Sequence, residues 1–315
     1  MPTISVNACA MPQRHSIFPN FNQQVSMTTN QYVLTGRCPD RVGVMAGLMA
    51  VLAGQGAWIS DSSNHADADS SQFFVRAVFH LDGDEEQTRG RLLQALDGFR
   101  QQFSMVLDIH PTAHRMKVLF AVSKHGHCLN HLLHKWHSNE LPIDVVGVVS
   151  NHEDMRRLVE WYDIPFHYRP IQNGDKRAQE RSMLQLMDES EAELLVLARY
   201  MQVLSDEMCV GLSGRCINIH HSFLPSFKGA RPYHQAYARG VKVIGATAHY
   251  VTADLDEGPI IEQETVRVSH SLKADDYVKL GKDVENVVLA RAVQWHAQRR
   301  ILPNGLRTIV FPPGN

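Results

Sequence analysis

The chain has 315 residues, 44% of them hydrophobic, and its 31 lysines and arginines against 33 acidic residues give a net charge of −2. This near-neutral balance argues against a nucleic-acid binder, and no uninterrupted apolar stretch reaches the roughly 18 residues that a membrane-spanning helix needs. The five cysteines are scattered without a C-x-x-C pair, which predicts neither a disulfide framework nor a thiolate zinc site, so we expect a cytoplasmic protein.

The N-terminal part of the chain predicts an extension followed by a small domain. Residues 1–27 lack an apolar segment after a basic start, so we expect a disordered extension and not a secretory signal. Residues 28–110 show the order βαββαβ, which is typical of a ferredoxin-like sandwich. The predicted strands are 32–38, 58–66, 71–81 and 104–110, and the predicted helices are 39–56 and 84–103.

A second domain, residues 116–315, is expected after a linker at 111–115. Its early strands are apolar on every face and alternate with helices, which is typical of a parallel sheet covered on both sides. Two later, longer strands alternate in character and predict an antiparallel pair. We therefore expect an α/β, Rossmann-like domain with a mostly parallel sheet. The predicted strands are 116–123, 143–150, 193–200, 215–220, 241–252 and 259–269, and the helices are 127–137, 178–189 and 274–300.

The segment "RCINIHHSFLPS" places Asn218, His220 and His221 where a strand opens into a loop. Ligands of open α/β sheets bind beyond the carboxyl ends of the strands. A second strand leads into "TADLDEGP", which contains Asp254 and Asp256. An amide and an imidazolium can donate to a developing oxyanion, and a carboxylate can orient or deprotonate a nucleophile. The set suits attack on a carbonyl; the alternative is a solvated histidine pair beside ordinary turn acids.

Most of residues 115–300, with "NIHHSFLPSFKGA", "GATAH" and "DEGP" in that order, resembles the folate-dependent formyltransferase family. The resemblance implies 10-formyltetrahydrofolate as substrate, no tightly bound cofactor and no metal. It implies that Asn218, His220 and Asp256 are catalytic. The stretch "LARYMQVLS" is similar to the segment that lines the pterin pocket. The substrate-binding residues implied in this way are Met201, Gln202, Val203, Leu204, His249, Thr252, Asp254 and Gly258.

Two departures from the phosphate-binding members concern the acceptor side. The first loop reads "SKHGHC", with only Gly126, where those members have a glycine-rich loop whose N–H groups hold a phosphate. His221 follows His220 where many transferases have proline. This form resembles the branch in which water is the acceptor, which implies hydrolysis to tetrahydrofolate and formate, a supply of formate for purine biosynthesis and a balance of the one-carbon pool. The alternatives are transfer to an unphosphorylated amine, or a non-catalytic folate or amino-acid sensor.

The stretch "CPDRVGVMAGLMAVLAGQG" resembles the ACT family. The resemblance implies a homo-oligomer formed through this domain, with a small amino-acid effector such as glycine or methionine. The implied effector-binding residues are Asp40, Arg41, Val42 and Gly43. Trp58 stands where many ligand-binding members have asparagine, so a purely structural, dimer-forming domain is the alternative.

Two cofactor-dependent readings are weaker. His127, His131 and His134 share one face of a predicted helix, as zinc ligands can, but no acidic ligand or H-E-x-x-H partner accompanies them. No G-x-G-x-x-G follows the first apolar strand of the second domain, which argues against a dinucleotide-dependent dehydrogenase.

Overall fold

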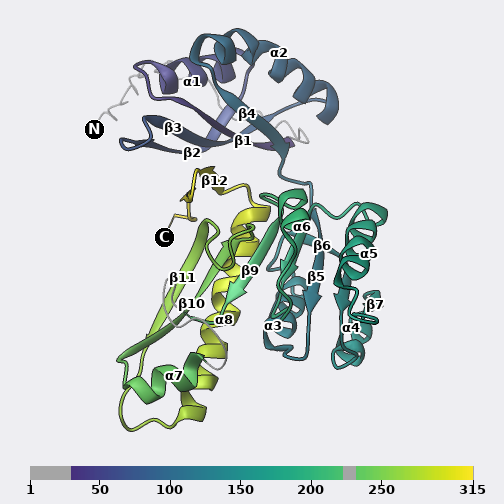
Figure 1. Ribbon diagram of the computed structural model, residues 1–315. Coiled ribbons are helices and arrows are strands. Elements are labelled where there is room, and N and C mark those ends of the chain that lie inside the picture. The colour runs from purple at the N-terminus through teal and green to yellow at the C-terminus, as the bar shows by residue number, and fades with distance from the viewer. Residues whose placement is uncertain (1–29, 223–231, 315) are drawn as a thin grey trace, which may run out of the picture.

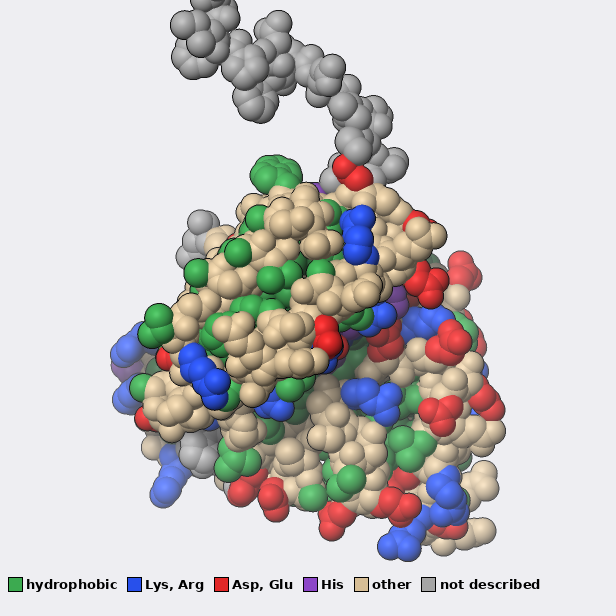
Figure 2. Space-filling model, turned by 90° about the horizontal axis from the view of Figure 1, so that it is seen from above, with side chains coloured by type: hydrophobic (Ala, Val, Ile, Leu, Met, Phe, Trp, Pro, Cys, Tyr) green, Lys and Arg blue, Asp and Glu red, His purple; other side chains and the backbone are tan. Residues whose placement is uncertain are grey.

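A computed structural model describes residues 30–222 and 232–314, which form two packed domains (Figure 1). The expected extension at 1–27 and the whole "FLPSFKGAR" segment lie outside the described residues. Charged side chains of both signs are interspersed over the face seen in Figure 2, as the near-zero net charge suggests. None of the described helices is long and apolar enough to cross a membrane.

The N-terminal domain has the predicted βαββαβ order, compatible with an ACT-like domain. Its antiparallel sheet has the order β2-β3-β1-β4. Both helices lie on one face of this sheet (Figure 1) and bury Leu48, Leu92 and Leu96 against it. Asp84 caps α2 by accepting from the Gln87 N–H. The elements are β1 (Asn30–Pro39), α1 (Val44–Gly54), β2 (Trp58–Asp67), β3 (Gln72–Leu81), α2 (Glu85–Phe103) and β4 (Val106–Pro111).

The opposite face of the N-terminal sheet packs on the end of the chain. A hairpin of β12 (Ile301–Asn304) and β13 (Arg307–Val310) lies beneath that face (Figure 1). Phe74 of β3, only 1% exposed, packs there against Leu302 and Phe311. The sequence analysis did not predict this hairpin. Its two-residue turn is Gly305-Leu306, and Gly305 has the positive φ of 61° that the first central position of such a turn needs.

The second domain contains a seven-stranded sheet with the order β11-β10-β9-β8-β5-β6-β7. The pairs from β7 to β9 are parallel, whereas β9–β10 and β10–β11 are antiparallel, so the predicted mostly parallel sheet with an antiparallel pair is confirmed. Its strands are β5 (Met116–Val122), β6 (Ile143–Ser150), β7 (Phe166–Tyr168), β8 (Leu194–Leu197), β9 (Cys216–His220), β10 (Val243–Tyr250) and β11 (Ile260–Arg267).

Helices cover both faces of this sheet. On one face α3 and α8 bury Leu132, Val288 and Leu289 in the largest core; on the other, α5 and α6 bury Met183 and Met208. The short helices α4, α6 and α7 were not predicted, because fewer than three helical turns leave too little periodicity to detect, and the strand β7 has only three residues. The helices are α3 (His127–His137), α4 (Arg156–Trp161), α5 (Lys176–Glu189), α6 (Asp206–Gly211), α7 (Pro232–Arg239) and α8 (Ala274–Ala297).

Candidate active site

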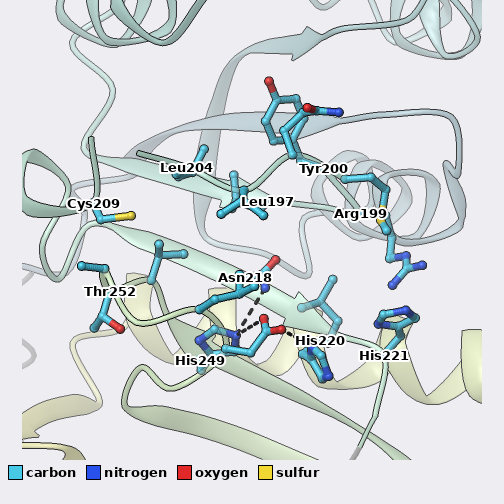
Figure 3. Close-up of a pocket in the computed structure, with 18 residues that line it drawn as sticks. Leu197, Arg199, Tyr200, Leu204, Cys209, Asn218, His220, His221, His249 and Thr252 are labelled. Atoms are coloured by element: carbon cyan, nitrogen blue, oxygen red, sulfur yellow. Dashed lines mark hydrogen bonds and ion pairs between the residues drawn. The ribbon is translucent and has the colours of Figure 1, made fainter. Parts of the chain in front are cut away.

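A pocket of about 330 Å³ opens beyond the carboxyl ends of β8 and β9. The two strands are parallel, so the segments that follow them meet at one edge of the sheet. The antiparallel register of β9 and β10 pairs Asn218 with His249 and His220 with Thr247, which brings the second loop to the same place. Figure 3 shows Asn218, His220 and His249 grouped at one wall, with Leu197 and Leu204 on the other side of the cavity. The predicted strand-end site is therefore present.

Asp256 is held between two histidines. Its Oδ2 lies 3.1 Å from His220 Nδ1, and its Oδ1 lies 3.7 Å from His249 Nε2. The Asn218 Nδ2 lies 3.3 Å from the same His249 Nε2. Asp256 has a left-handed φ of 59°, which aspartate tolerates better than most residues and which turns its carboxylate into the pocket. Side chains from two strands, β9 and β10, thus gather beside one carboxylate.

The hydrogen bonds assign the imidazole protons. His249 Nδ1 lies 2.9 Å from the Tyr250 carbonyl oxygen, which only accepts, so Nδ1 carries a proton. In the neutral ring His249 Nε2 then accepts from the Asn218 amide. By the same logic His220 Nδ1 donates to the Asp256 carboxylate, which leaves His220 Nε2 as the basic nitrogen.

Burial would raise the pKa of the Asp256 carboxyl, but the interactions with His220, which donates to it, and with the neighbouring His249 outweigh burial and hold the pKa well below its usual range. We therefore expect the carboxylate to be ionised near neutral pH. A carboxylate with so low a pKa orients and stabilises positive charge strongly, but it stores a proton poorly.

Asp256, His220 and Ser222 form a chain like that of a hydrolase triad, because His220 Nε2 lies 2.8 Å from Ser222 Oγ. Ser222, however, is 5% exposed and lines a neighbouring apolar pocket, and it is not among the residues that line the pocket around Asp256. The geometry thus favours a role for Ser222 in orienting the His220 imidazole and does not favour a role as nucleophile.

The segment that follows β8 lines the pocket with all four residues expected to contact folate: Met201, Gln202, Val203 and Leu204. Two buried side chains hold its ends. Ser123 Oγ accepts from the Met201 N–H at 3.0 Å. Glu180, 5% exposed, accepts from the Ser205 N–H at 2.9 Å and from the Ser205 hydroxyl. Because both ends are fixed, Met201 and Val203 project their exposed apolar side chains toward a ligand in a defined geometry.

Replacing Glu180 by alanine is expected to raise KM for the folate at least tenfold while kcat changes little. The variant frees the Ser205 end of the segment, and a segment that only binds substrate affects ground state and transition state alike. Steady-state kinetics with Glu180→Ala test this. Glu189→Ala, on the same helix and exposed, is the control. A fall in kcat with unchanged KM would contradict the assignment.

A buried ion network lies beside His221, and the sequence analysis missed it. Glu285 of α8, 2% exposed, lies 3.4 Å from Arg199 Nε and 2.8 Å from His127 Nε2, and it accepts from the Tyr233 hydroxyl at 2.8 Å. Figure 3 shows Arg199 beside His221 at one end of the cavity. Through this network α8 fixes the side of the pocket opposite the folate segment. Its only sequence signal is one acidic residue on the otherwise apolar face of a helix.

Three partly buried histidines make folding sensitive to pH. Burial, with nearby arginine charges, lowers the pKa of His110, His221 and His296 to about 4 each. The unfolded chain binds these protons near pH 6.5, so stability is fully present above that pH and is lost as the pH falls toward 4. We expect the free energy of unfolding to fall by roughly 3 kcal/mol per pH unit near pH 5. Urea titrations between pH 7.5 and 4.5 measure the slope.

His296→Gln is the matched variant for this pH dependence. It removes one of the three protons and should reduce the slope by about a third. A free energy of unfolding that stays constant from pH 6.5 to 5 would show that these rings are not neutral and buried in the folded protein.

Several predicted residues fall elsewhere. Thr252 and His249 line the pocket, but Asp254 is exposed and Gly258 is buried, and neither is among the lining residues. Gly258 instead allows a close chain approach, because a Cβ there would lie 1.8 Å from the Tyr250 carbonyl oxygen. On the acceptor side, His221 borders three adjoining pockets, whereas Gly126 packs on Met155. The residues expected to bind an effector, Asp40, Arg41, Val42 and Gly43, form an exposed loop before α1.

The zinc reading finds no support on the face of α3 where it was placed. His127 pairs with Glu285, whereas His134 is exposed. Within residues 30–222 and 232–314, the one group of three metal-type donors joins His127 to Cys128 and Glu285 and leaves out both other histidines. Arg199, close to the same carboxylate, already supplies a positive charge there.

Asn218, His220 and Asp256 thus lie together at the end of a mostly parallel sheet, in the part of the chain that a protein-family model matches. The model of the formyl transferase family matches residues 116–293, and the chain therefore belongs to this family. A formyltetrahydrofolate deformylase from Corynebacterium sp. (strain P-1) is 46% identical over 288 residues, which cover 89% of this chain and 98% of that relative.

Solved structures separate two branches of the family. A formyltetrahydrofolate deformylase from Burkholderia mallei ATCC 23344 is 48% identical, with a TM-score of 0.84 over 90% of this chain and 99% of its own. A glycinamide ribonucleotide transformylase from Symbiobacterium toebii is 27% identical, with a TM-score of 0.58 over 65% of this chain and 98% of its own. The match over nearly the whole length, both domains included, groups the chain with the formyltetrahydrofolate deformylases.

Proposed function

We propose that the protein hydrolyses 10-formyltetrahydrofolate with water to tetrahydrofolate and formate, and that Asn218, His220 and Asp256 catalyse the reaction. The observation that carries the assignment of residues is the Asp256 carboxylate, held between His220 and His249 beside the Asn218 amide in one pocket. The pterin binds along Met201–Leu204, which places the formyl group at this cluster.

In the proposed reaction Asp256 orients a water molecule. The water oxygen attacks the formyl carbon, a C–O bond forms, and the carbonyl electrons move to the formyl oxygen. Asn218 Nδ2 donates to that oxyanion, and the His220 imidazolium, once it has formed by taking the proton of the attacking water, donates to it as well. Because Asp256 stores a proton poorly, the proton from water passes on to His220. The imidazolium protonates N10 as the C–N10 bond breaks, and formate and tetrahydrofolate leave. Water as the acceptor means that no tightly bound cofactor is needed.

The loop at 123–126 supports water over a phosphorylated amine as acceptor. Ser123 is 3% exposed, and its hydroxyl donates to Asn151 Oδ1 at 2.8 Å while it accepts from the Met201 N–H. The loop is thus used to hold the folate segment, and it does not present a glycine-rich row of N–H groups to an anion.

The test is formate release from 10-formyltetrahydrofolate in buffer without any amine. We expect steady turnover in the wild-type protein. Asn218→Ala should lower kcat by roughly 10²–10³, since one oxyanion donor is removed, while the control Asn151→Ala changes mainly KM. Formate that forms only after an amine is added would make the protein a transferase. Tight folate binding without turnover would make it a sensor.

The N-terminal domain is proposed to mediate self-association and to bind an amino-acid effector at the exposed loop Asp40–Gly43. Its edge strands β2 and β4 support the first proposal, because they carry unpaired backbone groups at the sides of the sheet. Trp58, 69% exposed at the start of β2, stacks on His80 with 5.0 Å between ring centroids.

The formate released is proposed to serve one-carbon metabolism, including purine biosynthesis, in the cytoplasm. For the N-terminal domain, the sedimentation coefficient of the full chain, measured with and without glycine or methionine, tests both self-association and the effect of an amino acid on it.

A further inference from the structure

A second pocket, about 380 Å³ in volume, lies between the two domains. One wall is the face of the N-terminal sheet that carries no helices, and the other is the end of α8 with the chain that follows it. None of its lining residues belongs to the pocket around Asp256. The proposed reaction uses none of them either. The polar residues that line it include Asp61, Arg76, His110, Gln298, Arg299 and Arg300.

Arg76 of β3 is the most unusual of these residues, because its guanidinium is 5% exposed. Nη1 donates to Asp61 Oδ2 at 3.1 Å, and Nη2 donates to the Gln298 carbonyl oxygen at 3.3 Å. The buried Nε has no hydrogen-bond partner among the described residues. The Asp61 side chain is half exposed, so water screens the one charge that opposes the buried guanidinium. An unpartnered buried donor of this kind is rare in native proteins.

The other wall adds positive charge. Arg300 donates to two neutral acceptors, Gln298 Oε1 at 2.9 Å and the Phe311 carbonyl oxygen at 3.0 Å. Arg299 lies 3.5 Å from Glu193 Oε2, a carboxylate that is not part of the lining. Burial, and then the charge of Arg300, lower the pKa of Arg76 to about 10. Three guanidiniums therefore line this pocket, and Asp61 is the one carboxylate among its lining residues.

Another arginine at the domain interface, Arg307, differs from those in the pocket because carboxylates neutralise it. At the hairpin end, Arg307 lies 3.2 Å from Asp67 Oδ2 and 3.1 Å from Asp69 Oδ2, so two carboxylates face one guanidinium. Among the residues that line the pocket, arginines outnumber carboxylates, with three guanidiniums to one carboxylate. An anion is the group that would satisfy Arg76 Nε and balance the three arginines, and planar guanidiniums bind carboxylate and phosphate groups in a bidentate manner.

We propose that this interdomain pocket is a binding site for a small anionic ligand that carries a carboxylate or a phosphate group. Arg76 binds the anion from the N-terminal domain, and Arg300 and Arg299 bind it from the chain after α8. Because the ligand contacts both domains, its binding strengthens their association. The site is independent of the folate pocket, so the ligand does not compete with 10-formyltetrahydrofolate.

Isothermal titration of inorganic phosphate and, separately, of acetate into the full chain at constant ionic strength tests the site. We expect saturable binding of at least one anion, with a Kd of about 1 mM or tighter. Arg76→Gln and Arg300→Gln should each weaken it at least tenfold. Asp61→Asn should tighten it, because the competing carboxylate is gone. Arg307→Gln, which also breaks an interdomain contact but lies outside the lining, should leave it unchanged.

The variants separate a ligand site from a structural arginine. If Arg76→Gln does not fold, Arg300→Gln and Asp61→Asn still decide, because these side chains are partly exposed. A preference for phosphate would assign the site to a phosphorylated small molecule, and a preference for acetate to a carboxylic acid. No saturable binding up to about 20 mM of either anion, or binding unaffected by Arg300→Gln and Asp61→Asn, would overturn the proposal.

Discussion

Replacing Asp256 by asparagine is expected to lower kcat for formate release by about 10³–10⁴, near the upper end of what one acid–base group contributes. The substitution keeps the volume but removes the charge that fixes the proton on His220 Nδ1 and that we propose orients water. The low pKa of Asp256 adds a second expectation. Since this pKa lies well below its usual range, we expect any acid limb of the wild-type pH–rate profile near neutral pH to reflect another group.

Asp254→Asn is the control for this variant, because it removes a carboxylate from the same loop that is exposed and outside the pocket lining. It should retain turnover within about twofold. Unfolding curves of both variants establish that the fold is intact. An Asp256→Asn protein that keeps a tenth or more of the wild-type kcat would remove Asp256 from the centre of the mechanism.

Replacing Glu285 by alanine is expected to lower the free energy of unfolding by about 3–5 kcal/mol. Glu285 is 2% exposed, and its loss leaves the charge of Arg199, itself 10% exposed, without a carboxylate in the interior. The Tyr233 hydroxyl loses its acceptor at the same time. Breaking a buried pair costs far more than the pair contributes over an apolar replacement. Urea unfolding at pH 7.5 measures the change.

Two variants calibrate this result. Glu264→Ala breaks a pair with Arg291 in which both side chains are over two-fifths exposed, so it should cost less than about 1 kcal/mol. Tyr233→Phe removes one hydrogen bond to Glu285 but keeps the ion pair, and it should cost about 1–3 kcal/mol. If Glu285→Ala proved no worse than Glu264→Ala, the network would be solvated and not buried.

The larger elements were predictable because the order of apolar and polar residues along them indicates which faces are buried. The strands at 116–122 and 143–150 are apolar on both faces, and β10 and β11 alternate as an antiparallel pair does. The hairpin at 301–310 escaped prediction because two strands of four residues are too short for an alternation to stand out. The glycine at the first central position of its turn, Gly305, was the usable signal.

The residues of the site likewise fall into those that the sequence could point to and those that only the fold brings together. Asn218, His220 and Asp256 lie in segments whose motifs are local, so a resemblance could point to them. Arg199 and Glu285 lie on different elements and meet only through the packing of α8 on the sheet, which no local spacing records. His249 was singled out, but its bridging position between Asn218 and Asp256 depends on the register of β9 and β10.

The packing of the hairpin beneath the N-terminal sheet also sets an order of events during synthesis. Domains fold largely as units, and the N-terminal one first. The nascent N-terminal domain therefore leaves the ribosome with Phe74 and Val78 of β3 uncovered, although both are less than a tenth exposed in the finished protein. The residues that cover Phe74, Leu302 and Phe311, are made only after the whole catalytic sheet. Until then an apolar face is open to wrong partners, so the yield of folded protein in a cell depends on how long that interval lasts.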